Sequence, residues 1–139
     1  MIVVLQSLQV ALGAIRRQIG NRDNVRYTDD HRQALAIIKE IAATRIVVIM
    51  SDHYLGEDVT GSTLAQDFKT ERPNAWCLLY TSERPNPGPS VDGVINKLSN
   101  SLPKDAIRLL VDAGIDDPGK FPNLESLYEA FPWIQRPVR

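Results

Sequence analysis

Apolar and polar residues follow one another in blocks that predict strands and helices in alternation. Five short apolar runs predict strands, and the third and fourth have the continuous pattern of strands buried on both faces. The runs are Ile2–Leu5, Val25–Tyr27, Ile46–Met50, Ala75–Tyr80 and Val91–Ile95. Other stretches have apolar residues at helical spacing. These are Leu8–Ile19, a segment capped by Thr28 or Asp29 and ending near Ala43, one from Ser62 or Thr63 to Glu71, Lys104–Ala113 and Asn123–Ala130.

This alternation predicts an α/β sandwich of three layers around a parallel five-stranded sheet, with right-handed crossovers. One connection departs from the pattern. The stretch Arg84–Ser90 reads RPNPGPS, with three prolines and one glycine, and no helix can run through it. We therefore expect the helix between the fourth and fifth strands to be shortened or missing.

Composition limits the class of protein. The chain has 139 residues, which predicts one domain. It has 16 basic and 17 acidic residues, and this near balance argues against nonspecific electrostatic binding to nucleic acid or anionic lipid. Cys77 is the single cysteine and lies in an apolar run, so we expect a buried, inert thiol. No apolar stretch reaches the roughly 20 residues that span a membrane, and the start of the chain lacks the features of a signal peptide. These observations predict a cytoplasmic location.

Candidate chemistry gathers where the strands end. Asp52 closes the third strand, Thr81 closes the fourth and Lys97 closes the fifth. In parallel sheets, binding and chemistry occur just beyond the carboxyl ends of the strands. A carboxylate, a hydroxyl and an ammonium are thus expected at one edge.

In these positions the chain resembles a response-regulator receiver domain (CheY-like), over about residues 1–112. The resemblance implies a flavodoxin-like fold, with Asp52 as the phosphoacceptor and with Thr81 and Lys97 contacting the phosphoryl group. Leu55 and Gly56 stand where the family commonly has an aliphatic residue and a proline, and Gly61 is one residue away from its glycine before the third helix. Residues 114–139 form an extension beyond residues 1–113, the receiver-like domain.

The metal-binding part of the pattern is not matched. The family holds Mg²⁺ with an acidic pair after the first strand, and Gln6 and Ser7 occupy those positions. Neutral groups attract a dication far less than carboxylates do. The pair Asp29-Asp30 follows the second strand, where helix capping is the expected role. Glu57 and Asp58 are close enough to Asp52 in sequence to approach a metal from the loop.

Two further departures concern signal output. Val94 is the residue nearest to the place where the family often has an aromatic switch residue. Only fifteen residues separate Thr81 from Lys97, where the family usually fits a helix and a loop. The extension carries an apolar cluster that either folds back on the domain or docks a partner. Its members are Leu124, Leu127, Tyr128, Phe131 and Trp133.

These patterns favour an atypical stand-alone receiver, or pseudo-receiver, that signals through protein contacts and is not an enzyme. In that reading Asp52 pairs with Lys97, metal-dependent phosphorylation is weak or absent, and no cofactor or metal is needed. The expected partner is a histidine kinase or a downstream signalling protein, with a homodimer as an option and no role for nucleic acid or membrane. His31 and His53 are expected to have surface roles.

Three alternatives stay open. The first is a phosphorylatable single-domain response regulator that uses Asp52 and Mg²⁺. The second is a small ligand- or nucleotide-binding protein on a flavodoxin-like sheet, because a fold does not fix a function. The third is a structural oligomerisation module.

Overall fold

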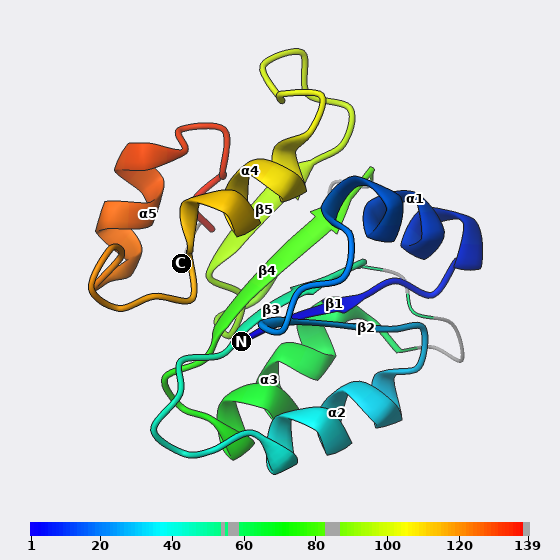
Figure 1. Ribbon diagram of the computed structural model, residues 1–139, viewed down its shortest axis with the longest axis vertical. Coiled ribbons are helices and arrows are strands. Elements are labelled where there is room, and N and C mark those ends of the chain that lie inside the picture. Colours follow the sequence, from blue (N-terminus) through cyan, green and yellow to red (C-terminus); the bar gives the residue numbers. More distant parts are fainter. Residues whose placement is uncertain (54, 56–58, 83–86, 138–139) are drawn as a thin grey trace.

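The fold is built on a parallel sheet with the strand order β2-β1-β3-β4-β5 (Figure 1). A computed structural model describes residues 1–53, 55, 59–82 and 87–137. The five strands are β1 (Ile2–Leu5), β2 (Val25–Thr28), β3 (Val48–Ser51), β4 (Trp76–Thr81) and β5 (Gly93–Asn96). The register pairs Leu5 with Ser51 and Thr81 with Asn96, so neighbouring strands end together at one edge of the sheet.

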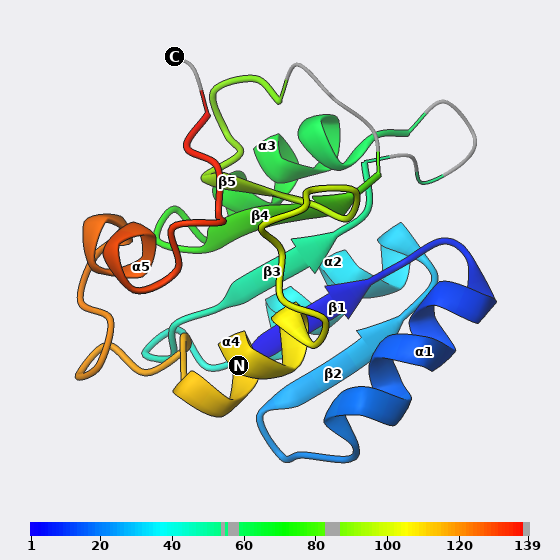
Figure 2. The same cartoon turned by 90° about the horizontal axis from the view of Figure 1, so that it is seen from above.

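Helices cover both faces of the sheet, as the two views in Figures 1 and 2 show. One face carries α2 (His31–Glu40) and α3 (Gly61–Glu71). The opposite face carries α1 (Gln9–Ile19), α4 (Ala106–Ala113) and α5 (Leu124–Ala130). Each face has its own cluster of buried apolar side chains, which accounts for the continuous apolar runs of the central strands. The predicted flavodoxin-like sandwich is therefore confirmed.

The connection between β4 and β5 contains no helix among its described residues, 82 and 87–92. The helix predicted from Lys104 follows β5 and is α4. The two helices that share a face of the sheet with α1, α4 and α5, therefore both follow β5 in the chain. No helix among the described residues is long and apolar enough to cross a membrane.

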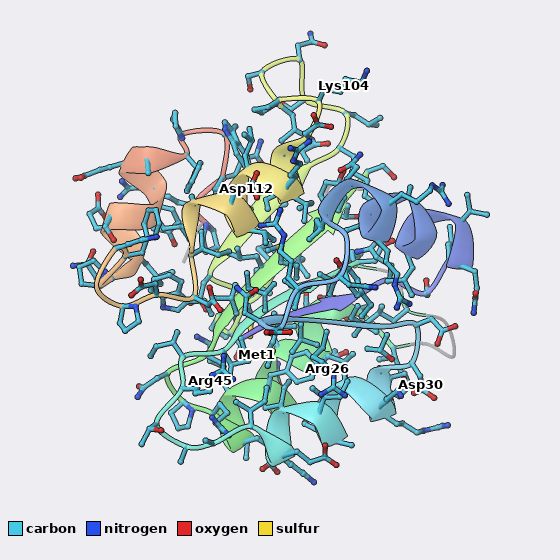
Figure 3. The ribbon with its side chains drawn as sticks, in the orientation of Figure 1. Met1, Arg26, Asp30, Arg45, Lys104 and Asp112 are labelled. Carbon is cyan, nitrogen blue, oxygen red and sulfur yellow. The ribbon has the colours of Figure 1, made fainter. Side chains whose placement is uncertain are left out.

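The predicted starts of α2 and α3 are wrong, and local hydrogen bonds explain both. Helix α4 also begins later than predicted, at Ala106 and not at Lys104. The cap of α2 is Asp30, which is labelled in Figure 3, and not Thr28 or Asp29. Its Oδ1 accepts a hydrogen bond from the Arg32 N–H at 2.7 Å. That bond favours the carboxylate and lowers the pKa of Asp30. Helix α2 also ends at Glu40, before the predicted Ala43.

Helix α3 begins at Gly61, ahead of the predicted Ser62 or Thr63. Thr60 is its cap, and Thr60 and Thr63 form a reciprocal capping box in which the Thr60 hydroxyl accepts from the Thr63 N–H at 3.2 Å. In the sequence, the three-residue spacing of Thr60 and Thr63 indicates this capping box.

The C-terminal extension folds back onto the domain. Ile115, Leu127 and Ile134 are each at most 3 % exposed and belong to the same apolar cluster as α1 and α4. Beyond α5 the chain reaches the outer edge of β5, where Gln135 forms an antiparallel bridge with Val94. The extension thus completes one layer and covers one edge of the sheet.

Two neighbouring leucines of α4 test this packing. Leu110 is fully buried, whereas Leu109 is 42 % exposed on the same helix. We expect Leu110→Ala to lower the free energy of unfolding by about 2–5 kcal/mol, because it removes core contacts and leaves a cavity. Leu109→Ala should change it by less than about 1 kcal/mol. Urea unfolding followed by circular dichroism measures both, and similar losses for the two variants would contradict the burial of α4 described here.

The buried thiol gives a second prediction. Cys77 is 3 % exposed, and burial raises its pKa to about 12. The folded state therefore keeps the thiol neutral, a preference that is lost as pH rises from the ordinary thiol pKa toward 12. At pH 8 we expect Ellman's reagent to modify Cys77 slowly in the native protein and rapidly in urea, because the thiolate is the nucleophile. Rapid modification of the native protein would contradict this burial.

Candidate functional site

The ends of β1, β3 and β5 bring three predicted site residues together. Gln6 follows β1, Asp52 follows β3 and Lys97 follows β5. Backbone hydrogen bonds continue the ladder into this region, from the Asp52 N–H to the Leu5 oxygen at 3.1 Å and from the Lys97 N–H to the Thr81 oxygen at 2.9 Å. The same pairing that builds the sheet therefore sets the spacing of these side chains.

The Lys97 ammonium lies at the centre of this site. Its Nζ is 3.9 Å from Asp52 Oδ2 and donates a hydrogen bond to Gln6 Oε1 at 3.3 Å. It also lies 4.6 Å from the centre of the Tyr80 ring, within the range of a cation–π contact. The Lys97 and Asp52 side chains are 25 % and 17 % exposed, so this partly desolvated pair is screened less than a pair on the open surface.

Gln6 is fully buried, and its Nε2 has no hydrogen-bond partner among the described residues. A buried amide N–H without a partner costs free energy, and the described residues offer no acceptor to Gln6 Nε2. Ser7, the other position of the missing acidic pair, is half-buried. The two side chains that follow β1, Gln6 and Ser7, are thus both neutral.

No group of three or more His, Cys, Asp or Glu side chains placed to hold a metal ion occurs among the described residues. The carboxylate of Asp29 accepts a hydrogen bond from Gln9 Nε2, and that of Asp30 caps α2. Both acids are therefore engaged away from Lys97. Glu57 and Asp58, the loop acids considered as metal ligands, lie outside the described residues, as does Gly56.

The segment after Asp52 is held closely against α3. Asp52 Oδ1 accepts a hydrogen bond from the His53 N–H at 2.7 Å, and the Gly61 N–H donates to the His53 oxygen at 2.7 Å. A Cβ added at Gly61 would lie 2.4 Å from the Asp52 backbone oxygen and 2.9 Å from Ser51 Oγ. Glycine is therefore required at this position by the close approach of the two backbones.

Thr81 is 1 % exposed at the end of β4, beside the strand that leads to Lys97. Tyr80, which precedes it, is a site residue that the sequence pattern predicts only as the end of an apolar strand. Its ring contacts the Lys97 ammonium, and burial raises its pKa. The sequence signal was an aromatic residue at the end of a strand, next to a predicted phosphoryl contact.

The geometry supports two chemical roles. The ammonium neutralises Asp52, and it could also face the oxygens of a phosphoryl group attached there. Among the described residues, the Lys97 ammonium is the charged group that faces Asp52.

The ion pair predicts a modest energetic coupling. A double-mutant cycle with Asp52→Asn, Lys97→Gln and the double variant should give a coupling of about 1 kcal/mol or less, because the atoms are 3.9 Å apart and partly exposed. Urea unfolding of the four proteins measures it. The coupling should shrink in high salt, and a coupling of zero at low salt would mean that the two charges do not interact.

Comparisons with known proteins were made for the sequence and for the fold. No family model and no curated protein matches the sequence. Three solved structures are similar. A protein described as an adenylate cyclase from Rhodopirellula baltica has a TM-score of 0.62 and 22% identity, covering 94% of this chain and 96% of that one.

The other two similar structures are receivers. The REC domain of RcsB from Salmonella enterica, with the phosphomimetic BeF3⁻, has a TM-score of 0.53 and 16% identity, covering 78% and 96% of the two chains. A Burkholderia pseudomallei response regulator with a phosphorylated aspartate, calcium and citrate has a TM-score of 0.52 and 16% identity, covering 94% and 91%. Together with the strand order and the position of Asp52, these likenesses show that the chain has the fold of a response-regulator receiver domain.

Proposed function

We propose that the chain is an atypical receiver that acts in signalling through contacts with other proteins, and that metal-dependent phosphorylation of Asp52 is weak or absent. One observation carries the proposal: the Lys97 ammonium contacts both Asp52 and the buried, neutral Gln6. A site built for Mg²⁺ would have carboxylates at the end of β1. Here the Lys97 ammonium already forms an ion pair with the Asp52 carboxylate.

Electrostatics support the weak response to metal. Mg²⁺ binds well when several oxygen ligands, usually including carboxylates, replace part of its hydration shell. Asp52 contributes one negative charge, and Lys97 would repel the dication at short range. Phosphoryl transfer to a carboxylate needs positive charge at the transferred oxygens, and a single ammonium supplies only part of it.

The remaining features of the proposal follow from this role. The chain would have a protein partner, either a histidine kinase or a downstream signalling protein, and would work in the cytoplasm without a cofactor or an enzymatic activity of its own. The name adenylate cyclase belongs to the Rhodopirellula protein. At 22% identity, the likeness in fold does not bring that activity to this chain.

The test compares the wild type with a variant in which the acids are restored. With Mg²⁺ and a small phosphodonor such as acetyl phosphate, we expect little or no acyl phosphate on the wild type, measured by intact mass. The double variant Gln6→Asp/Ser7→Asp should bind Mg²⁺ at least about tenfold more tightly and should gain phosphorylation, because two carboxylates then face the dication.

Two controls make this result specific. Adding Asp52→Asn to the restored variant should abolish the modification. Mg²⁺ should raise the melting temperature of the restored variant but not of the wild type, since only a bound ion stabilises the fold. Stoichiometric phosphorylation of wild-type Asp52 would instead make the chain a phosphorylatable response regulator.

A further inference from the structure

A cavity of about 450 Å³ lies at the edge of the sheet where β3 and β4 begin. The strands are parallel, so this edge is opposite to the one that carries Asp52 and Lys97. Its walls come from two distant parts of the chain, the stretch that leads from α3 into β4 and the connection between α4 and α5 (Figure 1). The volume is in the range of sites that bind small molecules.

The walls of this cavity are mostly apolar and only partly buried. Ile46, Trp76, Phe121 and Leu124 all line it, and each keeps an intermediate exposure. The last three pack at the margin of the apolar cluster that joins the sheet to α1, α4 and α5. Apolar surface in contact with water costs free energy, so an apolar ligand that covered these side chains would be bound favourably.

Three prolines make the walls stiff. Pro73 lies in the turn before β4, and Pro118 and Pro122 lie in the connection between α4 and α5. All three line the cavity and are exposed, so the cavity opens to solvent between them. Because proline fixes the backbone angle φ, these walls lose little conformational freedom when a ligand enters.

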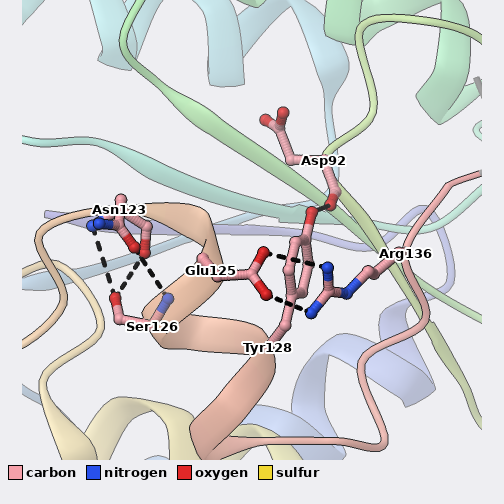
Figure 4. Close-up of polar contacts among 6 residues, drawn as sticks. All are labelled: Asp92, Asn123, Glu125, Ser126, Tyr128 and Arg136. Atoms are coloured by element: carbon pink, nitrogen blue, oxygen red, sulfur yellow. Dashed lines mark hydrogen bonds and ion pairs between the residues drawn. The ribbon is translucent and has the colours of Figure 1, made fainter.

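The start of α5 holds the second wall in place (Figure 4). Asn123 and Ser126 form a reciprocal capping box, in which Asn123 Oδ1 accepts from the Ser126 N–H at 2.9 Å. The Tyr128 hydroxyl donates to the backbone oxygen of Asp92, which ties α5 to the residue before β5. The C-terminal extension therefore supplies a wall that residues 1–113 alone would lack.

Lys69 is the charged side chain among the described residues that line the cavity. Its Nζ donates to the Ala75 oxygen and to Asp92 Oδ2, each at 2.6 Å. An ammonium has three N–H donors, so one remains for a ligand. The Lys69 side chain is 25 % exposed and that of Asp92 only 4 %, so a ligand would meet the ammonium before the carboxylate.

The ion pair of Lys69 with Asp92 sets the charge of a suitable ligand. The positive charge of the ammonium is already offset by a carboxylate at 2.6 Å. A ligand carboxylate would lose its hydration on entering and would also be repelled by Asp92. An uncharged acceptor, such as a carbonyl oxygen, loses less hydration and can still accept the third N–H of Lys69.

We propose that this cavity binds a small, uncharged, planar aromatic compound that carries a hydrogen-bond acceptor. Its ring would lie against Trp76 and Phe121, and its acceptor would receive a hydrogen bond from Lys69. This binding activity is additional to the signalling role proposed above, which concerns the opposite edge of the sheet. It is measured without metal or phosphodonor, so either proposal can fail alone.

Two probes test the chemistry in the full-length chain. Coumarin is planar and uncharged and has a carbonyl acceptor, and coumarin-3-carboxylate adds a negative charge. In proton–nitrogen NMR spectra the indole N–H of Trp76 reports on the cavity, and that of Trp133, which is not among the described lining residues, is the internal control. We expect coumarin to shift the Trp76 signal saturably, with a Kd of about 1 mM or lower, and to bind at least about fivefold more tightly than the carboxylate.

Two phenylalanines of one apolar cluster give a matched pair of variants. Phe121 lines the cavity and Phe131 is not among its described lining residues, although their ring centroids are only 5.8 Å apart. We expect Phe121→Ala to weaken the binding of coumarin at least about tenfold and Phe131→Ala less than about twofold. Circular dichroism checks that both variants are folded.

A further variant tests the hydrogen bond while both aromatic walls stay in place. Lys69→Met alone would leave Asp92 buried and unpaired, so it is combined with Asp92→Asn, whose amide oxygen can still accept from the Cys77 N–H. We expect this double variant to bind coumarin at least about fivefold more weakly than the wild type.

Four results would overturn the proposal. They are an unshifted Trp76 signal at about 10 mM coumarin, binding of the carboxylate as tight as that of coumarin, equal losses in the two phenylalanine variants, and unchanged affinity in the double variant.

Discussion

The parallel register of the sheet is the constraint on which the site depends. Because β1, β3 and β5 run in the same direction and end at one edge, Gln6, Asp52 and Lys97 meet although they are far apart in sequence. The close contact of Gly61 with the backbone of Asp52 then fixes where the loop leaves the strand. The position of the acid is thus a consequence of strand pairing and of one glycine.

Within that frame, charge decides the chemistry. A receiver fold with carboxylates at the end of β1 would concentrate negative charge that only a dication or ammonium groups could balance. In this chain one carboxylate and one ammonium face each other, and a neutral amide accepts from the same ammonium. Among the described residues, the charge of Asp52 is therefore offset by the Lys97 ammonium.

Most of the fold could be predicted from the sequence, because buried parallel strands and amphipathic helices leave strong local patterns. The strand ends were also sufficient to place Asp52, Thr81 and Lys97 at one edge. Features that depend on contacts between distant segments were not predictable. The contact between Tyr80 and Lys97 is one example, since it needs the register of β4 and β5, and the docking of the extension on β5 is another. The prediction of the α2 cap was wrong for a smaller reason. Thr28, Asp29 and Asp30 can all accept a hydrogen bond from the first turn of a helix, and only the backbone conformation selects Asp30.

Residues 133–137 and the site meet on the same short strand. Val94 pairs with Gln135 on the outer edge of β5, and Lys97 follows the end of that strand, three residues later. The inner edge of β5 is fixed to β4, and Asp92, buried before β5, accepts hydrogen bonds from Lys69 and from the Cys77 N–H. The strand is therefore anchored at its beginning and along one side, while its outer side pairs with Gln135. The pairing of Val94 with Gln135 therefore acts on the same strand that positions the Lys97 ammonium against Asp52.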